Sequence, residues 1–509
     1  MNEEKSETTL RSNIEAVKTI VNTVKSTLGP LGRDKLLVDA GGNTIVTNDG
    51  ATIMRELDVS HPAGKMIIEC AQTQESLCYD GTTSSVVLGG EMLKNSVPLL
   101  DKGVHPNVVC NGYNQAAGMA IDYLTENLSI EDGHGYHKKE GVYKHDLKDI
   151  ARTAITGKTV DAALDEVAEL CVQAVKKAGD AEKVRVLCLP GGSLKDSYLF
   201  NGTIVNKDFV IDAESLLTHT HAVLINTGLE QQKTDENVQV QLDIQGYTQF
   251  KSSANDDVLE EAKKLVSLLG DGGVVFVRDG AIDTVVNYLH KHDIHVVRGL
   301  PESTMRALSS TLDLPVAQTP SDVQFATQAI VERERHYDVN YLFVGGADKS
   351  DQSTLILRGA TTTTLDEIER GFDDALGVVS LVMNGDEMVA GGGSAYAAMA
   401  QHVRREASSV SGRQQMAIEA FADALEVIPA TIAENGGLDP LDTILALRHF
   451  CAENHTDYGP NLDAGEGVTS MVELGVVEPS SLIRQAILSA TEVTTAILKI
   501  DDMIAKRGE

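Results

Sequence analysis

The hydrophobic positions at the start of the chain follow the spacing of a helix. From Leu10 to Leu28 the apolar residues fall at 10, 14, 17, 20, 21, 24 and 28. This spacing places them on one face of an α-helix, and Gly29-Pro30 is typical of a helix end. Further stretches of helical spacing follow the first 50 residues and run to about Leu128. The first quarter of the chain is therefore predicted to be mainly helical.

A β-hairpin and a sharp turn interrupt these helices. The runs 35–39 and 44–47 are rich in aliphatic and β-branched residues and flank the sequence Ala-Gly-Gly-Asn at 40–43. Such a pattern predicts two antiparallel strands joined by a tight turn. Asn48-Asp49-Gly50 then predicts a turn into a helix that begins near Ala51.

The pattern changes in the middle of the chain. The polar segment Glu131–His145 marks a boundary, and short β-type runs alternate with helices from Lys183 to about Gly346. The clearest such runs are Val184–Leu189, Ala222–Asn226, Gly273–Val277 and Ile294–Val297. After Asp366 the chain is again mostly helical and rich in alanine, and no internal repeat of 20–50 residues is present. An α/β middle thus separates two helical ends, either as three domains in a row or as one helical domain interrupted by an insertion.

Length and composition are those of a globular protein of several domains. A chain of 509 residues is long enough for about three domains, and 42% of its residues are hydrophobic. Aromatic residues make up only 4% and Trp is absent, so the interior is expected to be aliphatic. The formal net charge of −32 argues against nucleic-acid binding, which needs a cationic surface.

The cysteines and the absence of long apolar runs favour the cytosol. Six cysteines are scattered without a CxxC pair, which is typical of free thiols in a reducing compartment. The N-terminal sequence MNEEKSETTLRSN has no hydrophobic signal region, and no apolar run approaches the ~20 residues of a membrane span. We therefore expect a cytoplasmic protein.

One short motif, Asp80-Gly81-Thr82-Thr83-Ser84, carries candidate chemistry. A glycine followed by hydroxyl residues at a helix start suits phosphate, because the first N–H groups of a helix are unpaired and lie at its positive end. The preceding Asp80 would repel phosphate unless Mg²⁺ bridges carboxylate and phosphate oxygens. Taken alone, the motif also fits an ordinary Asp-Gly turn with Thr and Ser caps. No Walker A sequence is present.

Two neighbouring turns strengthen the phosphate interpretation. Thr27-Leu28-Gly29-Pro30-Leu31-Gly32 is a glycine-rich turn after a helix, and Asn48-Asp49-Gly50-Ala51-Thr52 is a second Asp-Gly turn that opens a helix. Three such turns within about sixty residues suggest that they share one site.

The motifs, taken in order along the chain, resemble those of the group II chaperonins, the family of the archaeal thermosome and the eukaryotic TCP-1 ring complex. The similar motifs are TLGPLGRDKLLVD, TNDGATI, DGTTS, RTAITGK, ERGFDDAL, AGGGSA, AENGGLDPLDTI and SATEVTTAILKIDDMI. The resemblance spans essentially the whole chain and is weakest between about Phe200 and Lys349.

The resemblance implies a multidomain α and α/β chaperonin fold. It assigns the mainly helical, discontinuous equatorial domain to residues 1–131 and 388–509. It assigns the intermediate domain to 132–198 and 356–387, and the α/β apical domain with a lid protrusion to 199–355. The lid would include Ile244–Tyr247. Subunits of this family form two stacked rings that enclose unfolded client proteins and close on ATP hydrolysis.

By the same resemblance, ATP and Mg²⁺ are the expected ligands, with Asp80 as the metal ligand. The residues that would contact the phosphates are Thr27, Leu28, Gly29, Pro30, Gly81, Thr82, Thr83 and Ser84. Asp49 resembles the catalytic acid of the equatorial domain, and Lys158 resembles a lysine that senses the γ-phosphate. Asp374 resembles the acid that orients the attacking water, and its neighbour Asp373 matches the motif less well.

The rest of the nucleotide site is also implied by resemblance. Gly392 matches a glycine that packs on the nucleotide, Asn461 and Leu462 match residues that line the base, and Glu478 matches an acid near the ribose hydroxyls. The chain departs from the family pattern at Tyr79, which replaces a glycine before DGTT. A second departure is Tyr396, which stands where a glutamate is common.

These features imply an ATP-hydrolysing chaperone subunit that assembles with identical or paralogous subunits, without nucleic-acid or membrane partners. The alternative is a nucleotide-binding structural ring subunit with little hydrolysis, and the presence of Asp49, Asp80 and Asp374 favours hydrolysis. A metabolic kinase is a third hypothesis, but no motif points to a pocket for an acceptor substrate.

Overall fold

The computed structural model describes most of the chain. The described residues are 2–38, 41–42, 44–130, 147–158, 163–230, 258–270, 272–336, 338–346, 352–462 and 467–502. The predicted boundary segment Glu131–His145 and the predicted lid residues Ile244–Tyr247 lie outside them. Within the described residues, none of the helices combines the length and apolar character that a membrane span requires.

The chain forms two compact units. The first, which we call the helical unit, contains residues 1–172, 193–195 and 359–509. The second, the α/β unit, contains residues 173–192 and 196–358. Because both chain ends belong to the helical unit, the arrangement is that of a helical domain interrupted by an insertion. The finer division into three domains remains a prediction.

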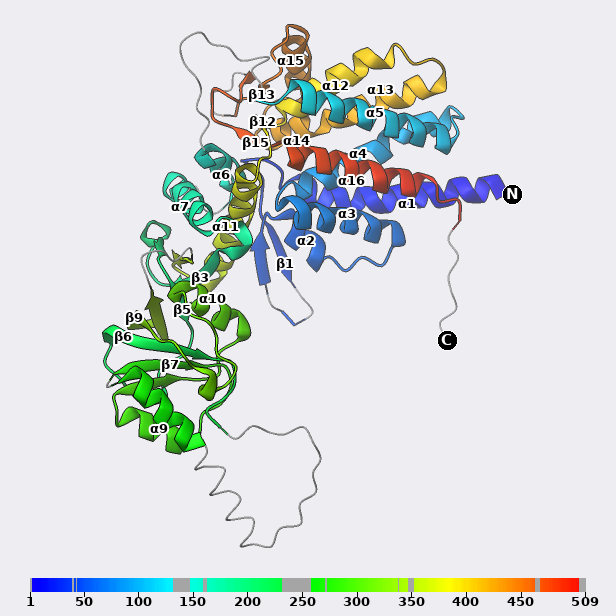
Figure 1. The fold of residues 1–509 in the computed structure, drawn as a ribbon. Coiled ribbons are helices and arrows are strands. Elements are labelled where there is room, and N and C mark those ends of the chain that lie inside the picture. The colour runs from blue at the N-terminus through cyan, green and yellow to red at the C-terminus, as the bar shows by residue number, and fades with distance from the viewer. Residues whose placement is uncertain are drawn as a thin grey trace. The chain divides into compact units, whose positions relative to one another are not determined.

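The described part of the helical unit consists mainly of long helices, with three small two-stranded sheets (Figure 1). Its N-terminal elements are α1 (Asn2–Lys25), β1 (Lys35–Val38), β2 (Thr44–Thr47), α2 (Gly50–Glu56), α3 (Pro62–Cys78), α4 (Thr82–Asp101), α5 (Pro106–Asn127) and α6 (Leu147–Ile155). Its C-terminal elements are α11 (Thr362–Met383), β12 (Met388–Ala390), α12 (Ser394–Ala407), α13 (Arg413–Leu425), α14 (Val427–Asn435), α15 (Pro440–Ala452), β13 (Tyr458–Pro460), β14 (Val468–Ser470), β15 (Val477–Pro479) and α16 (Ser480–Leu498). The chain leaves this unit within α7 (Leu164–Ala178).

Small residues let the central helices of this unit pack closely. A Cβ added at Gly89 in α4 would lie 3.7 Å from Ala490 in α16, so the two backbones approach each other there. The hydroxyl of Thr494 in α16 donates to the Gly89 carbonyl over 3.2 Å. The packing joins helices from the two ends of the sequence, which is how a domain made of two separate segments is held together.

The first helix ends earlier than its hydrophobic spacing predicts. α1 ends at Lys25, whereas the apolar pattern continues to Leu28. The side-chain amide of Asn435, from α14, donates to the carbonyl of Lys25 over 3.1 Å and to that of Leu28 over 2.8 Å. These bonds satisfy two of the carbonyls that a helix end leaves unpaired, so a distant residue stabilises the end of α1.

The predicted hairpin and Asp-Gly turn are confirmed. β1 and β2 pair antiparallel, with Lys35 opposite Thr47 and Val38 opposite Thr44. α2 starts at Gly50, and Asp49 is its N-cap: the carboxylate accepts from the N–H groups of Ala51 and Thr52 over 3.3 and 2.8 Å.

The α/β unit is built on a six-stranded mixed sheet in the order β5-β10-β9-β6-β7-β8. Its strands are β5 (Thr203–Val205), β6 (Leu216–Ile225), β7 (Gly273–Val277), β8 (Ile294–Val297), β9 (Thr327–His336) and β10 (Val339–Gly345). A three-stranded sheet contains β3 (Arg185–Pro190), β4 (Tyr198–Phe200) and β11 (Thr354–Gly359). The helices are α9 (Asp283–His290), α10 (Glu302–Leu312) and a helix at 258–269, with short 3₁₀ turns at Ala181–Lys183, Leu194–Asp196 and Pro320–Asp322.

Successive side chains of β6 and β7 pack into hydrophobic clusters on opposite faces of this sheet. Ala222 and Leu224 belong to the hydrophobic cluster that includes Leu308 of α10. Val223 belongs to a second cluster, which includes Val285 of α9. Successive side chains of a strand point to opposite faces, so strands buried on both faces appear in the sequence as continuous apolar runs. The four predicted runs correspond to β3, β6, β7 and β8.

Candidate functional site

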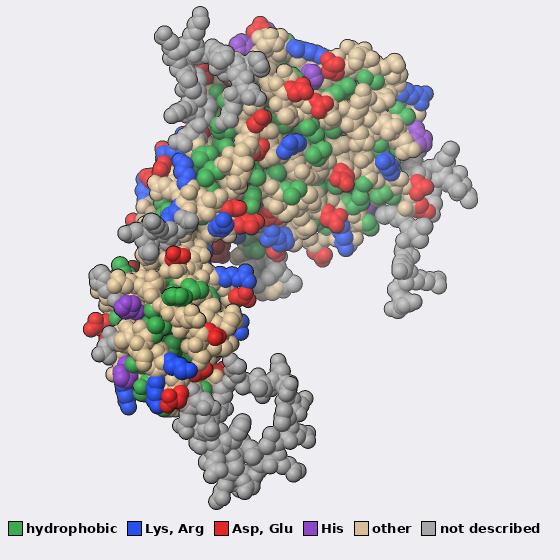
Figure 2. Space-filling model, viewed as in Figure 1, with side chains coloured by type: hydrophobic (Ala, Val, Ile, Leu, Met, Phe, Trp, Pro, Cys, Tyr) green, Lys and Arg blue, Asp and Glu red, His purple; other side chains and the backbone are tan. Residues whose placement is uncertain are grey.

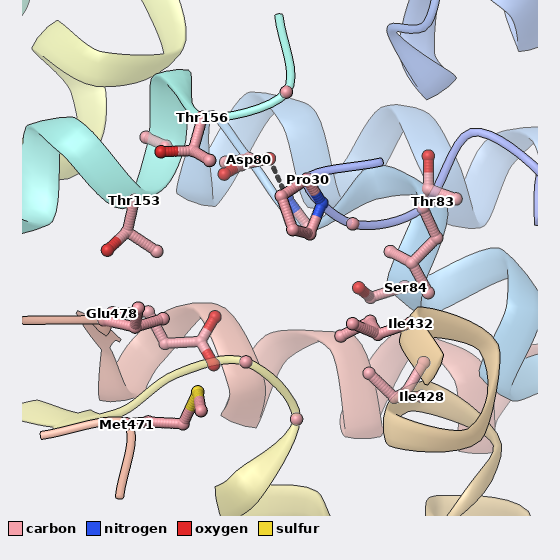
Figure 3. A pocket seen from close by; sticks show the side chains of 18 of the residues that line it. Pro30, Asp80, Thr83, Ser84, Thr153, Thr156, Ile428, Ile432, Met471 and Glu478 are labelled. Carbon is pink, nitrogen blue, oxygen red and sulfur yellow. Dashed lines mark hydrogen bonds between the residues drawn. The ribbon is translucent and has the colours of Figure 1, made fainter. Parts of the chain in front are cut away.

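One cavity of about 370 Å³ in the helical unit collects nearly all the predicted site residues. It is lined by Thr27, Leu28, Gly29, Pro30, Asp49, Asp80, Gly81, Thr82, Thr83, Ser84, Lys158, Gly392, Asn461, Leu462 and Glu478. Asp374 does not line the cavity, but its carboxylate pairs with the ammonium group of Lys158, which does. In Figure 3, Asp80, Thr153 and Thr156 lie along one side and Glu478 and Met471 along the other.

A buried glutamine holds the loop that carries Asp80 through hydrogen bonds. Gln74 of α3 donates one hydrogen bond of 2.9 Å to the Asp80 carbonyl and another of 3.1 Å to the carbonyl of Leu482 in α16. The Asp80 carboxylate accepts a hydrogen bond through Oδ1 from the Gly81 N–H over 2.7 Å. Among the described residues no donor reaches its Oδ2, which leaves that oxygen available to a ligand.

Gly81 is required at this turn for two separate reasons. Its φ of +81° is left-handed, a conformation that glycine adopts without the strain of a side chain. A Cβ added there would lie 2.8 Å from Leu482 Cδ2 and 2.9 Å from Gln74 Nε2. α4 starts at the next residue, and no side chain caps its first turn. The unpaired N–H groups at the start of α4 therefore lie at the cavity wall, as the motif predicts.

The two other predicted turns line the same cavity. Gly50 packs against Thr83, and a side chain at position 50 would overlap the Thr83 hydroxyl. Gly157, with φ of +85°, follows α6 and approaches the backbone of Pro30 so closely that an added Cβ would be 2.8 Å away. The Asn48 side chain donates to the Gly157 carbonyl over 2.7 Å, which fixes the turn before Lys158.

The opposite wall comes from the C-terminal half of the chain. Glu478 lies in β15, opposite Val389 of β12, and its carboxylate points into the cavity (Figure 3). Gly392, with φ of +62°, packs against Met471, and an added Cβ would lie 2.6 Å from its sulfur. Burial, and secondarily the charge of Asp80, raise the pKa of Glu478 to about 8.

Three acids and one lysine form the charged part of the site. Burial lowers the pKa of Lys158, but the carboxylates of Asp374, Asp80 and Asp49 outweigh it, so that the pKa is raised and the ammonium stays charged. Burial, and then the charges of Asp80 and Asp49, raise the pKa of Asp374 against the opposing effect of Lys158. The cluster thus carries more carboxyl groups than cations, which favours a bound cation or a proton.

Several lining residues were not predicted from the sequence. They are Arg152, Thr153, Ala154, Thr156, Gly157, Gly393, Tyr396, Ile428, Ile432, Pro460, Met471, Leu474, Gly475, Val476 and Leu482. Thr153 and Thr156 belong to the RTAITGK motif, so their nearness to Lys158 in the sequence could have indicated that they line the site. The hydrophobic residues Ile428, Ile432 and Met471 carry no local signal, since they look like ordinary core residues.

Comparison with known proteins gives a consistent result over the whole chain. The sequence profile of the TCP-1/cpn60 chaperonin family matches residues 20–507. The chain is 37% identical over 519 residues to thermosome subunit alpha of Archaeoglobus fulgidus, covering 98% of this chain and 92% of that protein. It is 36% identical over 515 residues to thermosome subunit beta of the same organism, with 98% and 92% covered. It is 38% identical over 508 residues to thermosome subunit alpha of Halobacterium salinarum, with 97% and 88% covered.

Proposed function

Because this chain belongs to the TCP-1/cpn60 chaperonin family, we propose that its cavity binds and hydrolyses Mg-ATP as one subunit of a group II chaperonin ring. The observation that carries the proposal is that turns from both halves of the chain bring the predicted residues to the same cavity. Hydrolysis would drive the folding of enclosed client proteins.

The triphosphate is proposed to lie at the start of α4. There the unpaired backbone N–H groups, the Thr83 and Ser84 side chains and the Gly29-Pro30 turn surround one end of the cavity. The base would lie toward Asn461 and Leu462, and Glu478 would accept hydrogen bonds from the ribose hydroxyls. Ile428, Ile432 and Met471 also line the cavity, and their apolar side chains would pack against the nucleotide.

The donor set fits Mg²⁺ through Asp80. Among the described residues, no group of three or more His, Cys, Asp or Glu side chains could hold a metal ion by itself. Mg²⁺ does not need such a cage, because it commonly uses one or two carboxylates together with substrate phosphates and water. The available Oδ2 of Asp80 supplies one such carboxylate. When bound, the ion would neutralise phosphate charge.

Asp374 is proposed to hold the attacking water and to accept its proton. Its pKa is raised by burial and by the neighbouring acids Asp80 and Asp49, which makes it a better proton acceptor than an ordinary carboxylate. Lys158 would bind the γ-phosphate while keeping Asp374 in place through their ion pair. Asp49 is held by its helix-capping bonds and would act as a fixed charge beside the reacting group.

Asp374 is preferred over Asp373 because of the groups that each one faces. The pKa of Asp374 responds to Lys158, Asp80 and Asp49, which are all cavity residues. The pKa of Asp373 is raised to about 6, first by burial and then by Glu369, and none of the cavity acids contributes. Asp373 therefore belongs to a different face of α11.

The proposed assembly rests on the similar proteins, and the proposed cellular compartment rests on the cysteines. Archaeoglobus fulgidus has thermosome subunits named alpha and beta, and we propose that this chain likewise joins identical or paralogous copies in a double ring. A lid in the α/β unit would close the chamber over unfolded clients. None of the six cysteines, all of which lie in the described part of the chain, forms a disulfide, which supports a reducing compartment, and we propose the cytoplasm.

The test is ATP hydrolysis by the purified protein with and without Mg²⁺. We expect Mg²⁺-dependent turnover that Asp80→Ala abolishes, because the other acids of the cluster are already engaged: Asp374 is paired with Lys158 and Asp49 caps α2. Asp58→Ala removes an exposed acid outside the cavity and should behave like the wild type. Wild-type turnover that survives chelation of all divalent ions would contradict the proposal. Tight ATP binding without turnover would support the alternative of a structural ring subunit.

A further inference from the structure

The end of α3 packs against the middle of α11 through one aromatic ring and one glycine. Tyr79 is the C-cap of α3, with φ of +64°, and its N–H donates to the Glu75 carbonyl over 2.9 Å. A side chain added at Gly377 would overlap the Cβ, Cγ and Cδ2 atoms of Tyr79. The base of the ring therefore lies directly on the backbone of α11, where only glycine leaves room for it.

This contact lies between two elements that the proposed hydrolysis must bring together. Tyr79 immediately precedes Asp80, the proposed Mg²⁺ ligand. Gly377 follows Asp374 by three positions, which is about one turn of an α-helix, so the two belong to the same stretch of α11. The ring thus touches the helix that carries the proposed proton acceptor within a turn of that residue.

Each of the two residues is unfavourable for the backbone at its own position. This indicates that the contact between Tyr79 and Gly377 compensates for the local cost. A non-glycine residue with a left-handed backbone is strained, and glycine at position 79 would relieve the strain. Gly377 lies in the interior of the 22-residue helix α11, where glycine weakens a helix relative to alanine. The contact explains both residues. The Tyr79 ring fits only because position 377 has no side chain, and the ring fills the space that a side chain at position 377 would occupy.

We propose that Tyr79 is a positioning residue for ATP hydrolysis, which rests on the function proposed above. The ring on Gly377 sets how closely α11 approaches the loop of Asp80, and thereby where Asp374 lies relative to the phosphates. It acts through Asp374 and does not contact the reacting atoms. Misplacement of a reacting group by about 1 Å can slow an enzyme by ~10²-fold, so even a small shift of α11 would be measurable.

The test is a double-variant cycle with hydrolysis and ADP binding measured separately. In Tyr79→Gly we expect kcat to fall by ~10-fold or more while the Kd for ADP changes less than about threefold, because the phosphate loop keeps its own bonds to Gln74. Tyr79→Phe keeps the ring atoms that touch Gly377 and should restore kcat. Asn454→Gly relieves another left-handed position, with φ of +67°, and controls for the backbone change alone.

The second half of the cycle probes the fit between the two residues. Gly377→Ala collides with the ring and should lower kcat in the wild-type background. In the Tyr79→Gly background the ring is absent, so Gly377→Ala has room for its methyl group and should not lower kcat further. Amide hydrogen exchange of the nucleotide-free protein should rise around residues 374–377 in Tyr79→Gly and stay unchanged in Tyr79→Phe.

The outcomes separate this inference from the proposed function. A wild type that does not hydrolyse ATP would overturn the proposed function. Normal wild-type hydrolysis combined with an unchanged kcat in Tyr79→Gly would overturn only the positioning role. Strictly additive losses for Gly377→Ala in the two backgrounds would likewise show that the two residues act independently.

Discussion

Replacing Gly81 by alanine should disturb the candidate site through crowding as well as through backbone strain. The left-handed φ of +81° makes any side chain unfavourable there, by about 1–2 kcal/mol. The new methyl group would also lie 2.8 Å from Leu482 Cδ2 and 2.9 Å from Gln74 Nε2. Leu482 is 3% exposed and Gln74 is fully buried, so neither side chain can easily move away. Crowding of this kind typically costs a further ~1–3 kcal/mol.

Gly103→Ala is the matched control for the backbone effect. Gly103 has φ of +72°, and nothing lies within 4 Å of an added Cβ. It therefore carries the left-handed strain without the crowding. In thermal denaturation we expect both variants to be less stable than the wild type, with Gly81→Ala the less stable of the two by the crowding contribution of about 1–3 kcal/mol.

Nucleotide affinity should separate the two variants more clearly than stability does. A shifted Gln74 would lose its hydrogen bonds to the carbonyls of Asp80 and Leu482, each of which contributes about 0.5–1.5 kcal/mol. Since 1.4 kcal/mol corresponds to a factor of ten, the Kd for ADP should rise ~10-fold in Gly81→Ala and stay within about twofold in Gly103→Ala. Isothermal titration calorimetry measures both. Equal affinities in the two variants would show that the loop absorbs the methyl group, and the argument from crowding would be refuted.

Three further predictions concern catalysis, pH and assembly. Asp374→Ala should bind ATP but hydrolyse it ~10²-fold more slowly or worse, and normal turnover in that variant together with slow turnover in Asp373→Ala would show that the wrong acid was chosen. Burial raises the pKa of the Glu478 carboxyl from 4.5 to about 8 in the folded state, so the wild type loses stability as pH rises from about 5 to 8. Glu478→Gln lacks this group, so in nucleotide-free protein with EDTA its stability relative to the wild type should increase across the same range, by up to about 1.4 kcal/mol per pH unit. A pH-independent difference in melting temperature would contradict the assigned shift. Finally, a net charge of −32 per subunit should make ring assembly favour high salt, because charge repulsion extends ~10 Å at 0.1 M salt but only ~3 Å at 1 M. Sedimentation velocity that shows equal ring populations across the salt series would point to local pairing of the interspersed acidic and basic side chains visible on the helical unit in Figure 2.

The sequence by itself determined the elements whose signals are local. The apolar runs at 273–277 and 294–297 coincide with β7 and β8, because a strand buried on both faces must be continuously apolar. The hairpin of β1 and β2 and the Asp49 cap of α2 follow from turn and capping residues within a few positions. The three turns at 27–32, 48–52 and 80–84 could be assigned to one site because they occur within about sixty residues of one another.

Only the tertiary structure decided which groups meet across the chain. The partner of Lys158 is Asp374, 216 residues away. The family motif favoured Asp374 over Asp373, but no capping or periodicity signal in α11 indicates that Lys158 pairs with it. Asn435 satisfies carbonyls at the end of α1, and Gln74 holds the loop of Asp80, although each looks like any polar helix residue in the sequence. Capping, turn and periodicity signals act over a few residues, whereas burial, pKa values and ion pairs depend on neighbours that only packing brings together. The motifs therefore predicted the residues of the site, and the packing of the two chain ends decided how those residues face one another.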